Sequence, residues 1–98
     1  MFSAVMRYRI KPGEADAFCR LWHETVFAHS STLDGLLSMQ LYRDEAGAYA
    51  FGIWRERECA EAFMRTGVFD TLMERAGTLL AGQPQQLEWE LVDWCCSS

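Results

Sequence analysis

Apolar and polar residues alternate with a period of two in four stretches of the chain, a spacing that predicts β-strands. The four predicted strands are residues 2–10, 36–43, 48–55 and 86–94. Pro12-Gly13 ends the first strand. Asp44-Glu45-Ala46-Gly47 joins the second strand to the third as a short hairpin connection.

Residues 14–30 show the helical spacing of about 3.6 residues per turn instead. At that spacing one stripe of the predicted helix is largely apolar and consists of Ala15, Phe18, Cys19, Trp22, Thr25, Val26 and His29. Asp16, Arg20 and Glu24 fall opposite this stripe. Phe27 falls toward the polar side, so it is a candidate for contact outside the monomer.

A second helical stretch covers residues 58–81 and is broken or kinked at Gly67. The element order is therefore β-α-β-β-α-β. This order predicts an α+β, ferredoxin-like βαββαβ fold with a four-stranded antiparallel sheet and both helices on one face. The first strand is expected at the centre, beside the fourth. Residues 1–98 are expected to form a single domain.

The alternation divides the strand residues between two sheet faces. The face under the helices is expected to carry Met6, Tyr8, Leu37, Met39, Leu41, Phe51, Ile53, Leu87, Trp89 and Leu91. The apolar residues expected on the other face are Val5, Trp54, Val92 and Trp94. The charged residues expected there are Arg7 and Arg9, across from Glu88 and Glu90.

An exposed apolar patch with compensated charge is suited to burial against a second sheet. A homodimer that mates two sheets face to face, a dimeric α/β barrel, is therefore expected. The alternative is a monomer with an amphipathic outer face. A chain this short gains from sharing a core with a partner.

Composition excludes several other classes of protein. The net charge is −5 and Lys11 is the only lysine, so nucleic acid is not an expected partner. No apolar run approaches about 18 residues, so no membrane span is expected. Four cysteines without metal-ligand spacing favour reduced thiols in the cytoplasm: Cys19, Cys59, Cys95 and Cys96. A redox or metal role for the adjacent pair near the C-terminus is the alternative.

Several segments of the chain, taken in order, resemble the sequence pattern of a known family. Lys11-Pro12-Gly13-Glu14 resembles the family's transition from first strand to first helix, and residues 33–38 (LDGLLS) resemble its entry to the second strand. Tyr42-Arg43-Asp44 is similar to the end of that strand. Residues 53–60 (IWRERECA) resemble the third-strand signature, and residues 66–69 (TGVF) lie where members often have a proline and a histidine before a phenylalanine. In their order and spacing, these segments resemble the antibiotic biosynthesis monooxygenase (ABM) family.

The resemblance implies a homodimeric α/β barrel with a ligand pocket between the sheet and the helices. It also implies, for many members, a cofactor-independent oxygenase that acts on quinols, anthrones and related aromatics. The haem-degrading branch uses an asparagine, a tryptophan and a histidine where this chain has Met6, Phe63 and Met73. Other members often carry histidines where this chain has Phe63 and Val68. No cofactor is therefore expected, and haem in particular is not.

Two polar residues are candidates for catalysis. His29 near the end of the first helix can act as a base toward a phenolic proton, because its ordinary pKa lies near 6.5. Tyr8 can donate a hydrogen bond to a ligand carbonyl or enolate. The structural alternatives are a hydrogen-bonded histidine at a helix end and a tyrosine whose hydroxyl meets a backbone carbonyl. His23 is expected at the surface.

Aromatic and methionine side chains are predicted to line the space between sheet and helices: Met6, Trp22, Met39, Phe63, Phe69, Met73 and Trp89. Polarizable sulfur and ring faces suit a flat aromatic ligand. The alternative is that the same residues fill a solid core.

Three functions follow as hypotheses. The first is a cofactor-independent monooxygenase acting on a small quinol, phenol or anthrone-like substrate. The second is a non-oxidative cyclase or isomerase of polyketide-type intermediates. The third is a small-ligand-binding dimer without chemistry, which a solidly packed interior would favour.

Overall fold

The computed structural model describes residues 1–30, 32–95 and 97. It contains a four-stranded antiparallel sheet in the order β2-β3-β1-β4. The strands are β1 (Phe2–Arg9), β2 (Leu36–Arg43), β3 (Gly47–Trp54) and β4 (Gln85–Leu87). The first strand lies inside the sheet beside the fourth, as the element order predicts.

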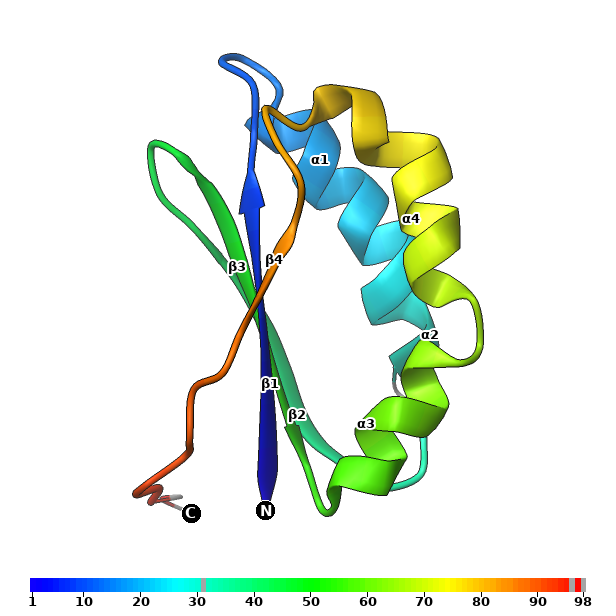
Figure 1. Ribbon diagram of the computed structural model, residues 1–98, viewed down its shortest axis with the longest axis vertical. Coiled ribbons are helices and arrows are strands. Elements are labelled where there is room, and N and C mark those ends of the chain that lie inside the picture. Colours follow the sequence, from blue (N-terminus) through cyan, green and yellow to red (C-terminus); the bar gives the residue numbers. More distant parts are fainter. Residues whose placement is uncertain (31, 96, 98) are drawn as a thin grey trace.

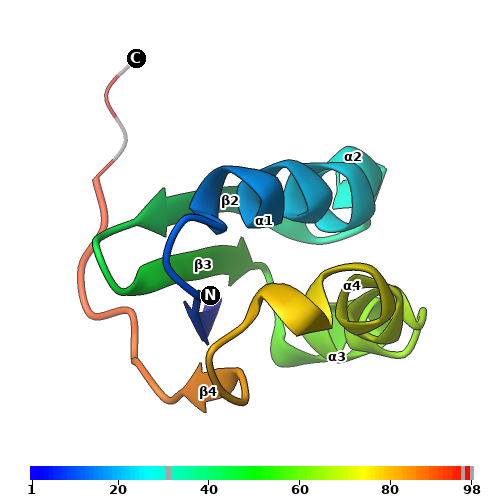
Figure 2. The same ribbon diagram turned by 90° about the horizontal axis from the view of Figure 1, so that it is seen from above.

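The helices form a single layer on one side of the sheet (Figures 1 and 2). The first rod consists of α1 (Ala15–Trp22), a π-helical segment η1 (His23–Phe27) and α2 (Ala28–Ser30). The second consists of α3 (Arg57–Met64), α4 (Val68–Ala76) and a short 3-10 turn η2 (Gly77–Leu79). The ferredoxin-like α+β fold is confirmed, including the break at Gly67 between α3 and α4. Among the described residues, no helix has the length and apolar character needed to cross a membrane.

The core lies between the sheet and both rods. Its buried members from the two layers include Tyr8, Phe18, Trp22, Trp54, Phe63 and Leu72. Phe18 of α1 packs on Tyr8 of β1 with ring centroids 5.0 Å apart. Phe63 of α3 packs on Trp54 of β3 at 5.5 Å. Each rod is therefore anchored to a central strand by an aromatic pair.

The predicted assignment of the β3 side chains to the two faces of the sheet is wrong. Trp54 faces the helices and is 2% exposed, whereas Phe51 packs against Tyr42 and Trp89 on the other face. Residues 47–54 are apolar on both faces, so alternation alone does not say which face is covered. Ala48 and Ala50 face the helices together with Trp54, and the large residues Tyr49 and Phe51 face away.

The structure also places several other strand residues differently from the prediction. Val5 is 1% exposed rather than open to water, because it lies opposite Phe51 and Leu87 in the register. That register puts Leu87 on the outer face, and it puts Ile53 there opposite Ser3. Met6, Tyr8, Met39 and Leu41 face the helices, as predicted. Leu37 is displaced by a bulge in β2 and is exposed.

The fourth strand is much shorter than predicted, because it ends at Leu87. Arg7 lies opposite Gln85, so the predicted pairing of Arg7 and Arg9 with Glu88 and Glu90 is wrong. The Arg7 guanidinium lies over the Tyr49 ring instead, 5.7 Å from its centroid. Residues 88–95 leave the sheet and cross the side opposite the helices (Figure 2).

Candidate functional site

An apolar cavity of about 80 Å³ lies between the sheet and the helical rods, and we call it the sheet–helix cavity. Three of the strand residues that line it are small, namely Ala4, Ala50 and Gly52. Predicted ligand-binding residues that line it are Met6, Trp22, Met39, Phe63 and Phe69, together with Tyr8. Small side chains on two adjacent strands leave this space, which larger ones would fill.

Gly52 keeps the sheet side of the cavity open. A Cβ at this position would lie 2.9 Å from Nε1 of Trp54 and 3.8 Å from Cε of Met39. The first distance is too short for nonbonded atoms, so any side chain here would push the Trp54 indole. Glycine therefore allows the indole to pack flat beside β3.

Tyr8 is the buried polar group of the cavity wall and is 3% exposed. Its burial raises the pKa of its phenol, and a hydrogen bond from the Trp22 indole to the hydroxyl oxygen partly opposes that rise. The Tyr8 hydroxyl thus stays protonated at neutral pH and keeps its own proton to donate. It is suited to donate a hydrogen bond and unsuited to act as a base.

Two of the predicted cavity residues lie elsewhere. Trp89 follows the end of β4 and stacks against Tyr49 and Phe51 on the outer face, so its predicted place under the helices is wrong. Met73 packs against the core from α4 but does not line the cavity.

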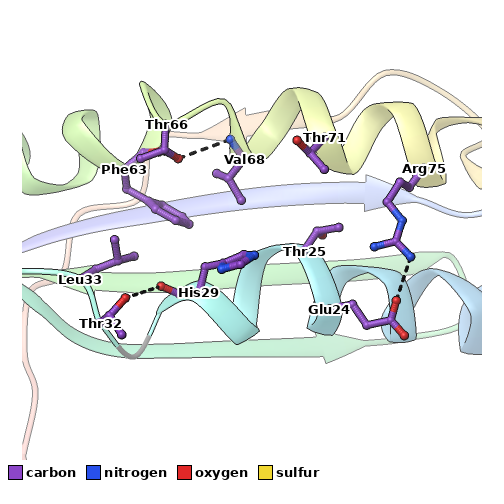
Figure 3. Close-up of a pocket in the computed structure, with 10 residues that line it drawn as sticks. All are labelled: Glu24, Thr25, His29, Thr32, Leu33, Phe63, Thr66, Val68, Thr71 and Arg75. Carbon is purple, nitrogen blue, oxygen red and sulfur yellow. Dashed lines mark hydrogen bonds and ion pairs between the residues drawn. The ribbon is translucent and has the colours of Figure 1, made fainter.

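His29 lies in a second space, an open cleft of about 430 Å³ between the two helical rods, which we call the interhelical cleft (Figure 3). His29 is exposed, although a uniform helical period places it in the buried stripe. The intervening η1 is π-helical, so each turn holds more residues and the angular step is smaller. The residues after η1 are therefore rotated relative to the prediction, and His29 faces the cleft.

The cleft also contains polar residues that sequence reasoning missed. Thr25 and Glu24 come from the first rod, and Thr66, Thr71 and Arg75 come from the second. The Arg75 guanidinium bridges to the Glu24 carboxylate across the cleft at 2.9 Å (Figure 3). None of these residues stands out in the sequence, and only the packing of the two rods brings them together.

Phe63 and Val68 line both spaces, so these two side chains separate the sheet–helix cavity from the cleft. Within residues 1–30, 32–95 and 97, no group of three or more His, Cys, Asp or Glu side chains is arranged to hold a metal ion.

Residues 1–75 match the sequence pattern of the family described as antibiotic biosynthesis monooxygenase. The chain belongs to this family. The resemblance seen in the sequence is thereby confirmed, although the match ends before η2 and β4. No curated protein matches the ABM chain significantly.

Solved structures show the same fold at low sequence identity. One described as an antibiotic biosynthesis monooxygenase is 18% identical, with a TM-score of 0.77, and the match covers 95% of this ABM chain and 100% of that one. Rv0793 from Mycobacterium tuberculosis is 17% identical, with a TM-score of 0.78 over 96% and 97% of the two chains. NE2512 from Nitrosomonas europaea, a protein of unknown function, is 18% identical, with a TM-score of 0.81 over 98% and 93%.

Proposed function

We propose that this ABM-family protein is a cofactor-independent monooxygenase that acts on a small aromatic substrate of the quinol, phenol or anthrone type. The observation that supports this proposal is the sheet–helix cavity, which is lined by aromatic and methionine side chains and has one buried hydroxyl, that of Tyr8. Such a wall suits a flat ring, and a buried proton donor orients the oxygen substituent of the ring. The presence of this cavity argues against a solidly packed interior, which would favour a protein that catalyses no reaction.

The substrate supplies the electrons in this reaction. A quinol and one O₂ give a hydroxyquinone and one water, with one oxygen atom entering the ring and the other leaving as water. The quinol loses four electrons and O₂ gains four. The protein's part is to remove a phenolic proton, hold the ring away from water and stabilise the developing anion.

We assign these parts to His29 and Tyr8. Tyr8 donates a hydrogen bond to the substrate oxygen inside the cavity and keeps its proton, because burial holds its pKa above the ordinary value. His29 is the proposed base and acts from the interhelical cleft. A substrate hydroxyl must therefore reach the cleft for His29 to take its proton.

Oxygen uptake tests this function. The purified protein, with metals and flavin removed, is mixed with 1,4-naphthoquinol, and O₂ consumption is measured against the rate without protein. The expected result is uptake well above that background, with His29→Ala lowering kcat/KM by about 100-fold or more. His23→Ala is the matched control, because His23 lies on the same rod outside both spaces.

Two results would contradict the proposal. One is uptake no faster than the background, and the other is turnover of an aromatic substrate at the same rate without oxygen. The second result would favour the non-oxidative cyclase or isomerase.

We also propose that the protein is a homodimer through the outer face of the sheet. Tyr42 and Trp89 are 60% and 50% exposed on that face, and they belong to an aromatic cluster with Tyr49 and Phe51. Trp94, in the segment that crosses it, is 49% exposed. An exposed aromatic surface of this kind is typical of a protein interface.

A further inference from the structure

The segment after β4 lies across the outer face of the sheet, opposite the helices, and we call residues 88–94 the strap (Figure 2). Trp89 stacks on Tyr49 with ring centroids 6.4 Å apart and packs on Phe51 at 5.6 Å. The Ser3 hydroxyl donates a hydrogen bond to the Trp89 carbonyl. The strap therefore covers part of the aromatic surface through which we propose that two copies of the chain associate.

Few contacts hold the strap in this position. Trp89 remains 50% exposed, and Val92 and Trp94 further along are 86% and 49% exposed. Within the part of the chain that the structure describes, no strap residue belongs to a strand or to an ion pair. A partner that buries more apolar surface on this face can therefore displace the strap.

The strap and a second sheet cannot occupy the outer face together. Two sheets that pack face to face lie about 10 Å apart, and their side chains fill this distance. A chain segment between them would hold the sheets farther apart and would separate Tyr42, Tyr49 and Phe51 from the partner. Association through this face therefore requires the strap to leave.

The edge of β1 beside the strap offers a place for the released segment. β4 pairs with Val5–Arg7, and in the described part of the chain no strand pairs with the β1 residues from Phe2 to Ala4 on that side. A cleft of about 460 Å³ is lined by the start of β1, by residues 86–91 and by Arg57. The free N–H and C=O groups of such an edge pair readily with another strand.

The register of β1 and β4 can continue into the strap. Val5 lies opposite Leu87, so three further pairs would place Phe2 opposite Glu90. Opposite residues of an antiparallel pair point to the same face of the sheet. Glu90 would then lie beside the Phe2 ring, which the Arg57 guanidinium covers at 4.7 Å, and could form an ion pair with that arginine. This pairing would also explain why the strand-like alternation of the sequence continues past Leu87.

We infer that the strap and a second copy of the chain compete for the outer face of the sheet, and that the strap released on association pairs with the open edge of β1 and lengthens β4. The chain thus has two states, a monomer with the strap across its sheet and a dimer with a longer fourth strand. This inference rests on the proposed homodimer and adds the step that controls its formation.

Sedimentation equilibrium measures the competition as a dimer dissociation constant. Ser3→Ala removes the hydrogen bond to the strap. It should lower the dissociation constant at least about fivefold, because both copies release a strap that has lost one bond. Ser38→Ala is the matched control, since Ser3 and Ser38 both lie opposite Ile53, on its two neighbouring strands, and Ser3 is the one that donates to the strap. The control should stay within about twofold of the wild type.

NMR spectra of the full chain at low and high concentration follow the strap itself. The monomer should show nuclear Overhauser contacts between the Trp89 indole and the Tyr49 ring, which stack in the structure. In the dimer these contacts should disappear, and backbone contacts between Phe2 and Glu90 should replace them.

A charge exchange tests the new position of the strap. Arg57→Glu should raise the dimer dissociation constant about threefold or more, because the new carboxylate repels Glu90 in the lengthened strand. Adding Glu90→Arg should restore the wild-type constant. Arg65→Glu is the control for the change in net charge, since Arg65 directly follows α3 and does not line this cleft.

The possible failures are distinguishable. If the wild type and every variant sediment only at 11.3 kDa, the homodimer and the competition are both wrong. If a dimer forms and keeps the Trp89–Tyr49 contacts, or if Ser3→Ala and Ser38→Ala give equal constants, the competition is wrong and the homodimer stands. A dimer that lacks the new backbone contacts, or a charge exchange that restores nothing, overturns the pairing of the strap with β1.

Discussion

Tyr8 has a testable effect on stability at alkaline pH. Burial raises its folded-state pKa above the ordinary value of 10.0. The contribution of Tyr8 to the free energy of unfolding is therefore complete below about pH 10. It falls as the pH rises toward the folded pKa, because the unfolded chain then releases the proton and the folded chain does not. The free energy of unfolding should drop in that range, by at most about 1.4 kcal/mol per pH unit.

Urea unfolding at pH 7 and at pH 10.5 measures this effect. Tyr8→Phe should remove the alkaline loss and also cost about 1–3 kcal/mol at pH 7, because the buried Trp22 N–H loses its acceptor. Tyr42→Phe is the control, since it removes a tyrosine hydroxyl on the other face of the sheet, away from Trp22. Equal alkaline losses in the wild type and in Tyr8→Phe would contradict the assignment.

A second prediction at the scale of single residues concerns Gly52. Gly52→Ala should lower the free energy of unfolding by about 1–3 kcal/mol, because its Cβ would press on the Trp54 indole. It should also weaken phenol binding, since the displaced indole enters the cavity. Gly77→Ala, which meets open space at a helical φ of −60°, should be neutral or slightly stabilising in the same unfolding assay. A Gly52→Ala protein as stable as the Gly77→Ala protein would contradict the proposed packing.

At the scale of elements, the joint between α3 and α4 depends on Gly67. Its φ of 84° is left-handed, and an L side chain costs about 1–2 kcal/mol there. Gly67→Ala should lose that amount in thermal or urea unfolding, and Gly67→Asn should lose less because asparagine tolerates this conformation. Equal stability of the wild type and both variants would show that the backbone at the joint differs from the one described.

The elements also show how far the sequence predicts the structure. Periodicity located both rods, β1, β2 and β3, and six residues of the cavity wall including Tyr8. It misplaced His29, because nothing in His23–Phe27 (HETVF) distinguishes a π-helical turn from an α-helical one. It also extended the fourth strand over residues 88–94, whose alternation continues after the hydrogen-bonded ladder has ended.

The sequence does not predict the interhelical cleft, and the reason is a different one. Its threonines and its Arg75–Glu24 pair come from separate parts of the chain, and their meeting depends on how the two rods are packed. Likewise, the strand at residues 47–54 is apolar on both sides, so its covered face is set by tertiary packing rather than by alternation.

At the scale of the whole molecule, the proposed homodimer predicts sedimentation at about twice the chain mass of 11.3 kDa at micromolar concentration. Tyr42→Glu places a charge on the outer sheet face and should shift the protein toward the monomer. Phe27→Glu is the matched control, because Phe27 is 41% exposed on the helical layer. A wild-type protein that sediments only at 11.3 kDa would contradict the dimer.

The occupancy of the sheet–helix cavity by an aromatic ring is the central claim, and methionine methyl NMR tests it most directly. The chain has five methionines. Met6, Met39 and Met64 line the cavity, whereas Met1 and Met73 do not. Titration of phenol into protein with ¹³C-labelled methionine methyl groups should shift the Met6, Met39 and Met64 signals saturably and leave those of Met1 and Met73 unchanged. Saturable shifts confined to Met1 or Met73, or none at Met6 and Met39, would contradict it.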